Sequence, residues 1–274
     1  NKTLEAFFYM NDTSLENLYS EIQEIEHNVV INLCKLGYTV YNNKDDNNQY
    51  VMMLENLVNN MSNLEVKIYL YFSCLYFIQN EKYKVALELI VLSQKIRASN
   101  DMLDAMFYEI SYYVKQRLLI KNCSNEDYNN AMNTYNKYHN MRRIIILALH
   151  KVKFLSRENP KKALKVLRNI KINDLSSDID SFYYYIKADT LVQLGNYKDA
   201  TLNLKHITET SNYYLRKMIL LLKICIEEED FNTIENIKEI VKSYKPKKHE
   251  MRSKINYHFL IQKDKKDQKE YLRD

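Results

Sequence analysis

Glycine and proline are almost missing from this sequence, and their scarcity limits what the chain can fold into more than any other feature. Among 274 residues there are two Gly and two Pro. All-β folds place Gly and Pro at many tight turns, and dinucleotide-binding α/β folds need a glycine-rich phosphate loop. Because 46% of the residues are hydrophobic, the chain has enough apolar material for a sizeable core. We therefore predict an all-α fold.

A short pattern recurs along the chain and indicates an internal repeat. In each copy an aromatic residue or Pro is followed, three positions later, by a small or apolar residue inside an amphipathic run. The copies are spaced 45, 32, 37 and 34 residues apart, and a tetratricopeptide repeat is 34 residues long. The first step therefore indicates an insertion. The copies end at Ala86, Ala131, Ala163, Ala200 and Ile234.

The clearest copy is Leu194-Gly195-Asn196-Tyr197-Lys198-Asp199-Ala200, which resembles the turn between the two helices of a tetratricopeptide repeat. Gly can adopt the left-handed conformation that ends the first helix. Tyr197 is then placed to fill the gap between the helices, and Ala200 lets their backbones approach. This resemblance covers roughly residues 63 to 243. It implies a right-handed superhelix of about five tetratricopeptide-like helix pairs, an α-solenoid, with extra helices at both ends.

The chain is expected to divide into three parts: N-terminal connecting or capping helices over 1–60, the repeat array over 61–244, and basic C-terminal capping or dimerisation helices over 245–274. Capping boxes at Thr13-Ser14-Leu15-Glu16 and Ser62-Asn63-Leu64-Glu65, and the pair Asn159-Pro160, predict three helix starts. We expect helices near 14–36, 47–60, 63–80, 82–99, 101–121, 125–139, 140–157, 160–171, 178–194, 197–209, 212–228, 231–244, 248–262 and 264–273.

No pattern of catalytic or metal-binding residues stands out. The six His lack metal-ligand spacing, and neither a phosphate-binding loop nor a nucleophile motif is present. We expect no enzyme activity, no cofactor and no metal. Cys34, Cys74 and Cys225 lie in apolar stretches and are expected to be reduced core residues of a cytoplasmic protein. There is no apolar run of membrane-spanning length and no signal peptide, so no membrane association is expected.

Because no catalytic pattern is found, we expect the protein to act by binding a partner on its surface. In stacked helix pairs, the first helix of each pair lines the inner face of the superhelix. Polar and aromatic side chains there can pair with the backbone of a bound peptide. The alternative is that these side chains are solvated or packed between helices. The candidates, found by counting back from the repeat positions, are Tyr71, Gln79, Tyr113, Gln116, Tyr185, Asp189, Gln193, Arg216, Lys223 and Glu227.

The degenerate array resembles the Rap, Rgg, NprR, PlcR and PrgX group of peptide-sensing regulators of Gram-positive bacteria, together with the phage arbitrium receptors. The resemblance implies a cytoplasmic sensor domain of a quorum-sensing transcription regulator. Such a domain binds a short signalling peptide, forms a homodimer and changes conformation or dimer geometry on binding. DNA contact is expected only through a helix-turn-helix, which the first 60 residues lack. Two alternatives stay open: a tetratricopeptide adaptor that binds a partner-protein segment, and a Rap-like module without a role in DNA binding.

Overall fold

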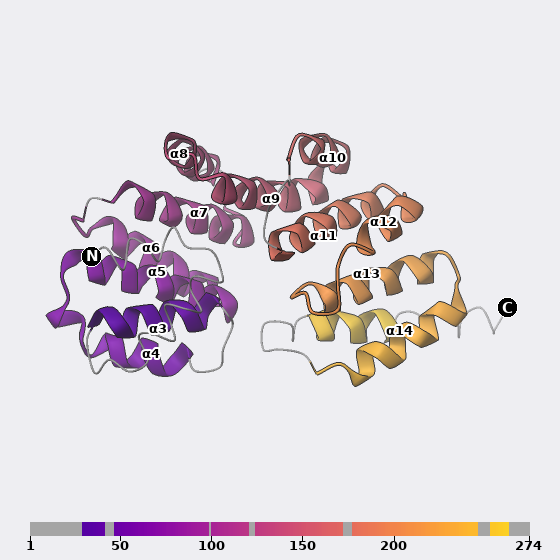
Figure 1. Cartoon of the computed structure of the whole chain (residues 1–274), viewed down its shortest axis with the longest axis horizontal. Helices are drawn as coiled ribbons and strands as arrows, with labels where there is room; N and C mark the ends of the chain where they lie inside the picture. The colour runs from indigo at the N-terminus through magenta and orange to yellow at the C-terminus, as the bar shows by residue number, and fades with distance from the viewer. Residues whose placement is uncertain are drawn as a thin grey trace. The chain divides into compact units, whose positions relative to one another are not determined.

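The computed structural model describes residues 29–41, 47–98, 100–120, 124–171, 177–245 and 253–262, and within these ranges all regular structure is helical (Figure 1). The chain divides into two compact units, Asn1–His139 and Asn140–Asp274. We call them the N-terminal and C-terminal units. The predicted all-α fold of paired helices is confirmed in both.

The described part of the N-terminal unit consists of three helix pairs. We call the first helix of each pair the A helix and the second the B helix. The A helices stack in sequence, because α5 contacts both α3 and α7. A short 3-10 turn, η1 (Val58–Asn60), links the first two pairs. The pairs are α3 (Val29–Tyr41) with α4 (Asn47–Glu55), α5 (Asn63–Gln79) with α6 (Tyr83–Gln94), and α7 (Asp101–Arg117) with α8 (Ser124–Lys137).

The C-terminal unit repeats this arrangement. Its central A helix, α11, contacts the A helices on both sides, α9 and α13. A further helix over 253–262 packs Tyr257, which is 7% exposed, into the last core cluster beside α13 and α14. The pairs are α9 (Met141–Glu158) with α10 (Pro160–Arg168), α11 (Ser177–Gln193) with α12 (Tyr197–Leu204), and α13 (Tyr214–Glu227) with α14 (Phe231–Ser243).

The recurring residue of the sequence pattern is buried in five of the six helix pairs that the structure describes. All five positions are on B helices, and each is at most 1% exposed. Four of them are Ala, whose single methyl group lets the B helix approach its A helix closely. The repeat spacing therefore predicted both the number of residues per pair and the residues that make the contact within each pair.

Several A helices end in a left-handed residue, although Gly occupies that position only once. Gly195 has φ +72°, and the corresponding residues Glu81, Leu119 and Glu229 have φ between 57° and 61°. The hydrogen bonds are those of a Schellman motif. The N–H of the residue after Gly195 donates to Leu191 O at 2.9 Å, and the equivalent bonds after the other three residues measure 2.8 to 3.0 Å. A common turn geometry is thus kept without its usual residue.

The predicted helix starts at Ser62 and Asn159 are confirmed. Ser62 forms a full capping box with Glu65, and the Asn159 side chain accepts a hydrogen bond from the Lys162 backbone N–H at 3.0 Å. The cap at Thr13-Ser14 lies outside the described residues, as do Cys123 and the helix expected at 264–273.

Four helix ends differ from the prediction by five residues. Two of them are B-helix ends: α6 stops at Gln94 rather than residue 99, and α12 stops at Leu204 rather than residue 209. The other two lie in the first pair. We expected a helix end at residue 36, just before Gly37, but α3 runs on to Tyr41. It continues because Thr39 and Val40 are 1% and 0% exposed, and this burial stabilises the last turn. At the other end of the pair, α4 stops at Glu55 rather than residue 60, and the chain continues through η1.

The cores are apolar, and three Cys are part of them. Cys34, Cys74 and Cys225 are free and buried, as the sequence predicted. Burial raises the pKa of the Cys34 thiol to about 11, so this thiol stays protonated at neutral pH. No helix in the described ranges has the length and apolar character that crossing a bilayer requires.

Candidate functional site

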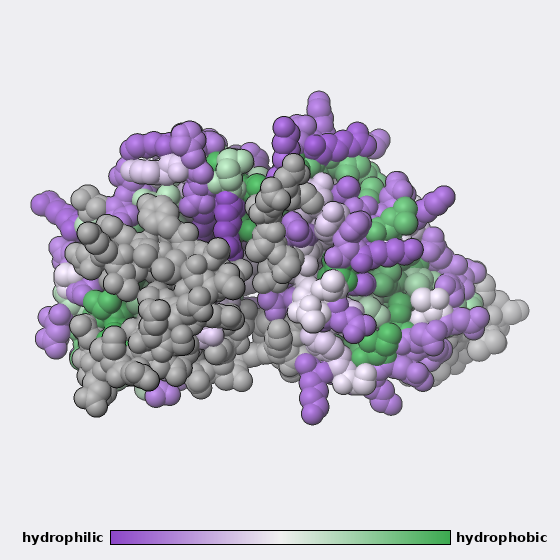
Figure 2. Space-filling model, in the orientation of Figure 1, coloured by the Kyte–Doolittle hydropathy of each residue, from purple (hydrophilic) through white to green (hydrophobic). Residues whose placement is uncertain are grey.

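The surface itself gives no simple indication of a binding site. On the face of the molecule drawn in Figure 2, polar side chains are spread over the described residues, with smaller apolar areas between them. The described residues contain no group of three or more His, Cys, Asp or Glu arranged to hold a metal ion. A candidate site must therefore be built from the positions and charges of particular side chains.

Three of the predicted residues form one stripe along α11. Tyr185, Asp189 and Gln193 are spaced four residues apart, so they lie on the same face of the helix. Other faces of α11 hold the core residues Ile186 and Ala188, which are 2% and 0% exposed. The stripe is more accessible: Tyr185 and Asp189 are half-buried and Gln193 is exposed. We call these three residues the α11 stripe.

Asp189 is a carboxyl group in a partly dehydrated position. Burial raises its pKa, because it disfavours the charged form, while the positive charges of Lys223, Arg157 and Lys153 act in the opposite direction. These cations come from the two helices that flank α11: Lys153 and Arg157 from α9, and Lys223 from α13. The stripe is thus bordered by positive charge on both sides.

Tyr185 lies in the same field. Burial is the main cause that raises the pKa of its hydroxyl, and the negative charge of Asp189 adds to the effect. Arg216 on α13 and Arg157 on α9 lower this pKa. The Tyr185 hydroxyl therefore stays protonated and is able to donate a hydrogen bond. We call Lys153, Arg157, Arg216 and Lys223 the cationic rim.

Aromatic rings hold one arginine of the rim in place. Tyr213 stacks on Phe182 with the ring centroids 5.3 Å apart, and its ring lies 5.7 Å from that of Tyr185. The Arg216 guanidinium carbon lies 5.1 Å from the Tyr213 centroid, within the range of a cation–π interaction. Tyr213 therefore lies next to both Arg216 and Tyr185, and the Arg216 charge lowers the pKa of Tyr185.

In the C-terminal unit, the structure brings together four of the predicted residues and adds two that the sequence reasoning missed. The charges of Asp189 and Arg216 act on Tyr185, and the charge of Lys223 acts on Asp189. Glu227 is exposed at the end of α13 and is not among the groups that act on Tyr185 or Asp189. The missed residues are Lys153 and Arg157. The sequence signal for them is their four-residue spacing on the A helix of the pair that ends with Ala163, which places both on one face of that helix.

The predicted residues of the N-terminal unit are mostly engaged within the fold. Tyr71 is 1% exposed, and its ring lies 5.7 Å from that of Phe107. The Gln79 amide donates to Val40 O at 2.6 Å and so ties α5 to the end of α3. Tyr113 accepts a hydrogen bond from Arg117 at 3.0 Å, and Gln116 lies half-buried on the same helix. Tyr71 and Gln79 are thus part of the packing between A helices, while Tyr113 is engaged within α7.

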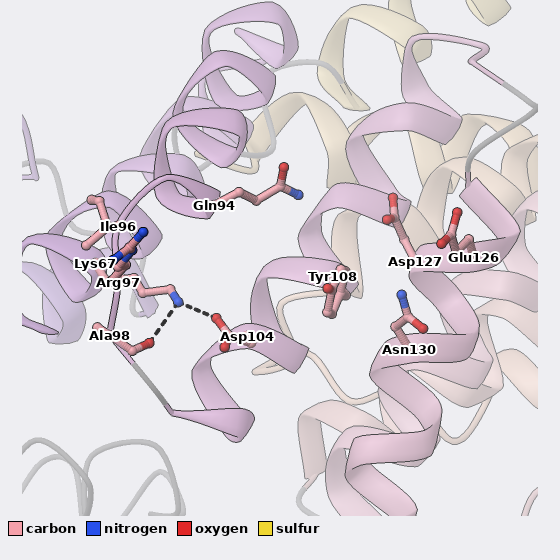
Figure 3. Close-up of a pocket in the computed structure, with 10 residues that line it drawn as sticks. All are labelled: Lys67, Gln94, Ile96, Arg97, Ala98, Asp104, Tyr108, Glu126, Asp127 and Asn130. Atoms are coloured by element: carbon pink, nitrogen blue, oxygen red, sulfur yellow. Dashed lines mark hydrogen bonds and ion pairs between the residues drawn. The ribbon is translucent and has the colours of Figure 1, made fainter. Parts of the chain in front are cut away.

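A separate open pocket of about 880 Å³ lies in the N-terminal unit (Figure 3). Its lining comes from α5, α7, α8 and the end of α6 with the segment that follows it. Lys67 forms an ion pair with Asp104 there and donates to Ala98 O at 3.1 Å. Asp127 accepts from Ser111 Oγ at 2.7 Å and from Lys115 Nζ at 2.6 Å. Most charged groups at this pocket are thus neutralised within the fold, so we do not assign a function to it.

By sequence, the chain matches no protein-family model and no curated protein. Among solved structures, it is similar to NprR in complex with its cognate peptide NprX, with a TM-score of 0.75 and 14% identity over 94% of this chain and 82% of that one. It is also similar to a Rap protein complexed with competence and sporulation factor, with a TM-score of 0.70 and 15% identity over 96% and 77% of the two chains. The apo form of the quorum sensor NprR from B. thuringiensis gives a TM-score of 0.71 at 15% identity, over 94% and 78%.

These likenesses concern the fold. At 14 or 15% identity, the shared feature is the array of helix pairs rather than any particular side chain. The resemblance to the fold of the NprR and Rap regulators, expected from the sequence, is confirmed at that level.

Proposed function

We propose that this chain is the peptide-binding sensor domain of an intracellular quorum-sensing regulator, and that the α11 stripe and its cationic rim contact the peptide. Two of the structures that share its fold, NprR with NprX and Rap with competence and sporulation factor, are complexes with such ligands. In this chain the proposal rests on the accessible polar stripe on α11, the A helix between α9 and α13.

The stripe has the chemistry that a peptide backbone requires. The Asp189 carboxylate accepts hydrogen bonds from backbone N–H groups, and the Gln193 amide both donates and accepts. The Tyr185 ring offers an apolar surface for a side chain, while its hydroxyl donates a hydrogen bond. An extended peptide that lies along the stripe would meet these groups in turn, as in other cases where a polar and aromatic surface reads a short segment.

Binding would change the protein through the spacing of its A helices. A peptide that contacts α9, α11 and α13 at once favours the helix spacing in which all its contacts are made. We propose that this preferred spacing alters the geometry of a homodimer. Light scattering of the purified chain, with and without peptide, measures whether a dimer forms and whether binding changes it.

Selection from a peptide pool tests the proposal. The immobilised chain is incubated with an equimolar pool of random hexapeptides with free ends, and retained peptides are identified by mass spectrometry. We expect a defined set of sequences to be enriched, and a synthetic member of that set to raise the melting temperature of the chain. Asp189→Ala and Gln193→Ala should each weaken binding by about tenfold, the value of one lost hydrogen bond of about 1.4 kcal/mol.

Glu239→Gln is the control, because this exposed side chain lies on α14, a B helix. It should leave binding unchanged. If no hexapeptide is enriched, the peptide-sensor proposal fails. Retention of a larger protein from a cell extract would then support the adaptor alternative.

A further inference from the structure

The stripe and its rim carry an excess of positive charge. The charges of four cations, Lys153, Arg157, Arg216 and Lys223, act on Tyr185 or on the Asp189 carboxyl group. Lys153, Arg216 and Lys223 are half-buried, and Arg157 is exposed. Because like charges repel more strongly as water is removed, the excess is costly at the three half-buried side chains. An arrangement of this kind is stabilised when an anion binds to it.

Among the described residues, three cations of the rim lack the ion pairs that several lysines of the fold form. Elsewhere Lys115 pairs with Asp127 at 2.6 Å, Lys137 with Asp101 at 2.8 Å and Lys238 with Glu235 at 2.7 Å. In the part of the chain that the structure describes, no ion pair joins Arg157, Arg216 or Lys223 to an acidic side chain. These three positive side chains are therefore available to pair with an anionic ligand.

We infer that the peptide bound at this site is acidic, and that one of its carboxylates is held beside Tyr185 by Arg216 and Arg157. This inference rests on the proposed function and adds the chemistry of the ligand. Arginine suits the task, because its planar guanidinium donates two parallel hydrogen bonds to a carboxylate. The Tyr185 hydroxyl, which stays protonated, can donate a third.

Arg216 is prepared for this contact before the ligand arrives. The Tyr213 ring, at 5.1 Å, restricts where its guanidinium lies, and Tyr213 is fixed by its stacking on Phe182. A side chain that is already ordered loses less conformational entropy on binding, which strengthens binding without any added contact. The positive charge of Arg157 on α9 also lowers the pKa of Tyr185, so charge is added from the opposite flank.

The carboxylate has two sources, an acidic side chain or the C-terminus of the peptide, and the test separates them. Hexapeptides enriched from the free-acid pool are resynthesised with an amidated C-terminus and, separately, with each Asp or Glu replaced by Asn or Gln. We expect the enriched set to be rich in carboxylates, and one of the two replacements to weaken binding by about tenfold. Raising the salt concentration should also weaken the binding of the parent peptides, because salt screens the attraction between opposite charges.

Arg216→Gln and Arg157→Gln in the full chain should each cost about tenfold in affinity for the enriched peptides. Arg168→Gln is the matched control, since Arg168 is exposed at the end of α10 and the change in net charge is the same. Circular dichroism and melting temperature establish that each variant is folded, and Arg216→Lys, which keeps the charge, should retain part of the binding.

The two proposals fail in different ways. Enriched peptides that are neutral or basic, or acidic peptides that bind both arginine variants as well as the wild type, overturn the inference about the ligand while peptide sensing stands. Absence of any enriched peptide overturns the proposed function itself.

Discussion

At the scale of single residues, three turns between paired helices contain backbone strain that the turn at Gly195 lacks. Glu81, Leu119 and Glu229 adopt the left-handed conformation that Gly195 adopts in the clearest copy. For residues with a Cβ this conformation costs about 1 to 2 kcal/mol, because the Cβ approaches the following carbonyl oxygen. The Schellman hydrogen bonds and the packing of each helix pair offset that cost. Stability can therefore be gained at these turns by substitution.

Glu229→Gly should stabilise the protein by about 0.5 to 1 kcal/mol, because Gly relieves the strain and loses only part of the gain to its greater freedom in the unfolded chain. The neighbouring Glu228, with φ −94°, has ordinary geometry. Glu228→Gly removes the same charge and should destabilise by about 0.5 to 1 kcal/mol. Urea unfolding of the two variants measures both effects. A change in the free energy of unfolding in the same direction for both variants would contradict the strain assigned to Glu229.

Asp189 should make stability depend on pH. Its pKa in the folded chain is raised by burial, so the folded state binds its proton more tightly than the unfolded state does. Ionisation then costs stability. This destabilisation is absent below the ordinary aspartate pKa of about 3.9, grows as the pH rises from there to the raised pKa, and is constant above it.

Asp189→Asn lacks this ionisation. The variant should be more stable than the wild type at pH 7, and the difference should vanish as the pH falls below the ordinary aspartate range. Urea unfolding of both proteins across pH measures it. If the wild type is the more stable at pH 7, attraction to the cationic rim outweighs burial, and the sign argued here is wrong.

At the scale of elements, a single residue joins α9 to α10. The Asn159 backbone N–H donates to Leu155 O at 2.7 Å and closes α9, while its side chain caps α10 through the Lys162 N–H at 3.0 Å. Pro160 follows as the first residue of α10, where its missing N–H costs nothing. The sharp reversal of the chain between these helices therefore depends on one side chain.

Asn159→Ala should destabilise the protein by about 1 kcal/mol, the typical cost of a lost N-cap. Asn159→Asp keeps an acceptor at the cap and places a negative charge at the positive end of the helix dipole, so it should be neutral or slightly stabilising. Thermal unfolding followed by circular dichroism compares the two. Equal losses in both variants would show that the cap is not the cause.

At the scale of the whole molecule, local signals predicted the helices better than they predicted the site. Scarce Gly and Pro and the recurring Ala86 to Ile234 pattern were enough for the all-α fold and for five of the helix pairs. The pair α3/α4 lacks that pattern, so the sequence did not indicate a sixth pair in the described residues. Cap signals such as Ser62 and Asn159 worked because capping depends on neighbours within four residues.

The site was harder to predict because it depends on three helices that are distant in sequence. The positions on α11 follow from helical spacing alone, but the rim residues Lys153 and Arg157 act on Asp189 only because α9 packs on α11. In the same way, the burial of Tyr71 depends on Phe107 from the next A helix. Spacing places a residue on a face, while burial is decided by what packs against that face.

The most direct measurement locates the bound peptide. A hexapeptide enriched by the chain is synthesised with a benzophenone side chain, cross-linked by light, and the modified residue is identified by mass spectrometry. We expect the cross-links to fall on the A helices of the C-terminal unit, α9, α11 and α13, and to be lost when unlabelled peptide competes. Competed cross-links confined to the B helices α10, α12 and α14, or to the pocket beside Lys67 and Asp104, would contradict the assignment of the α11 stripe as the peptide site.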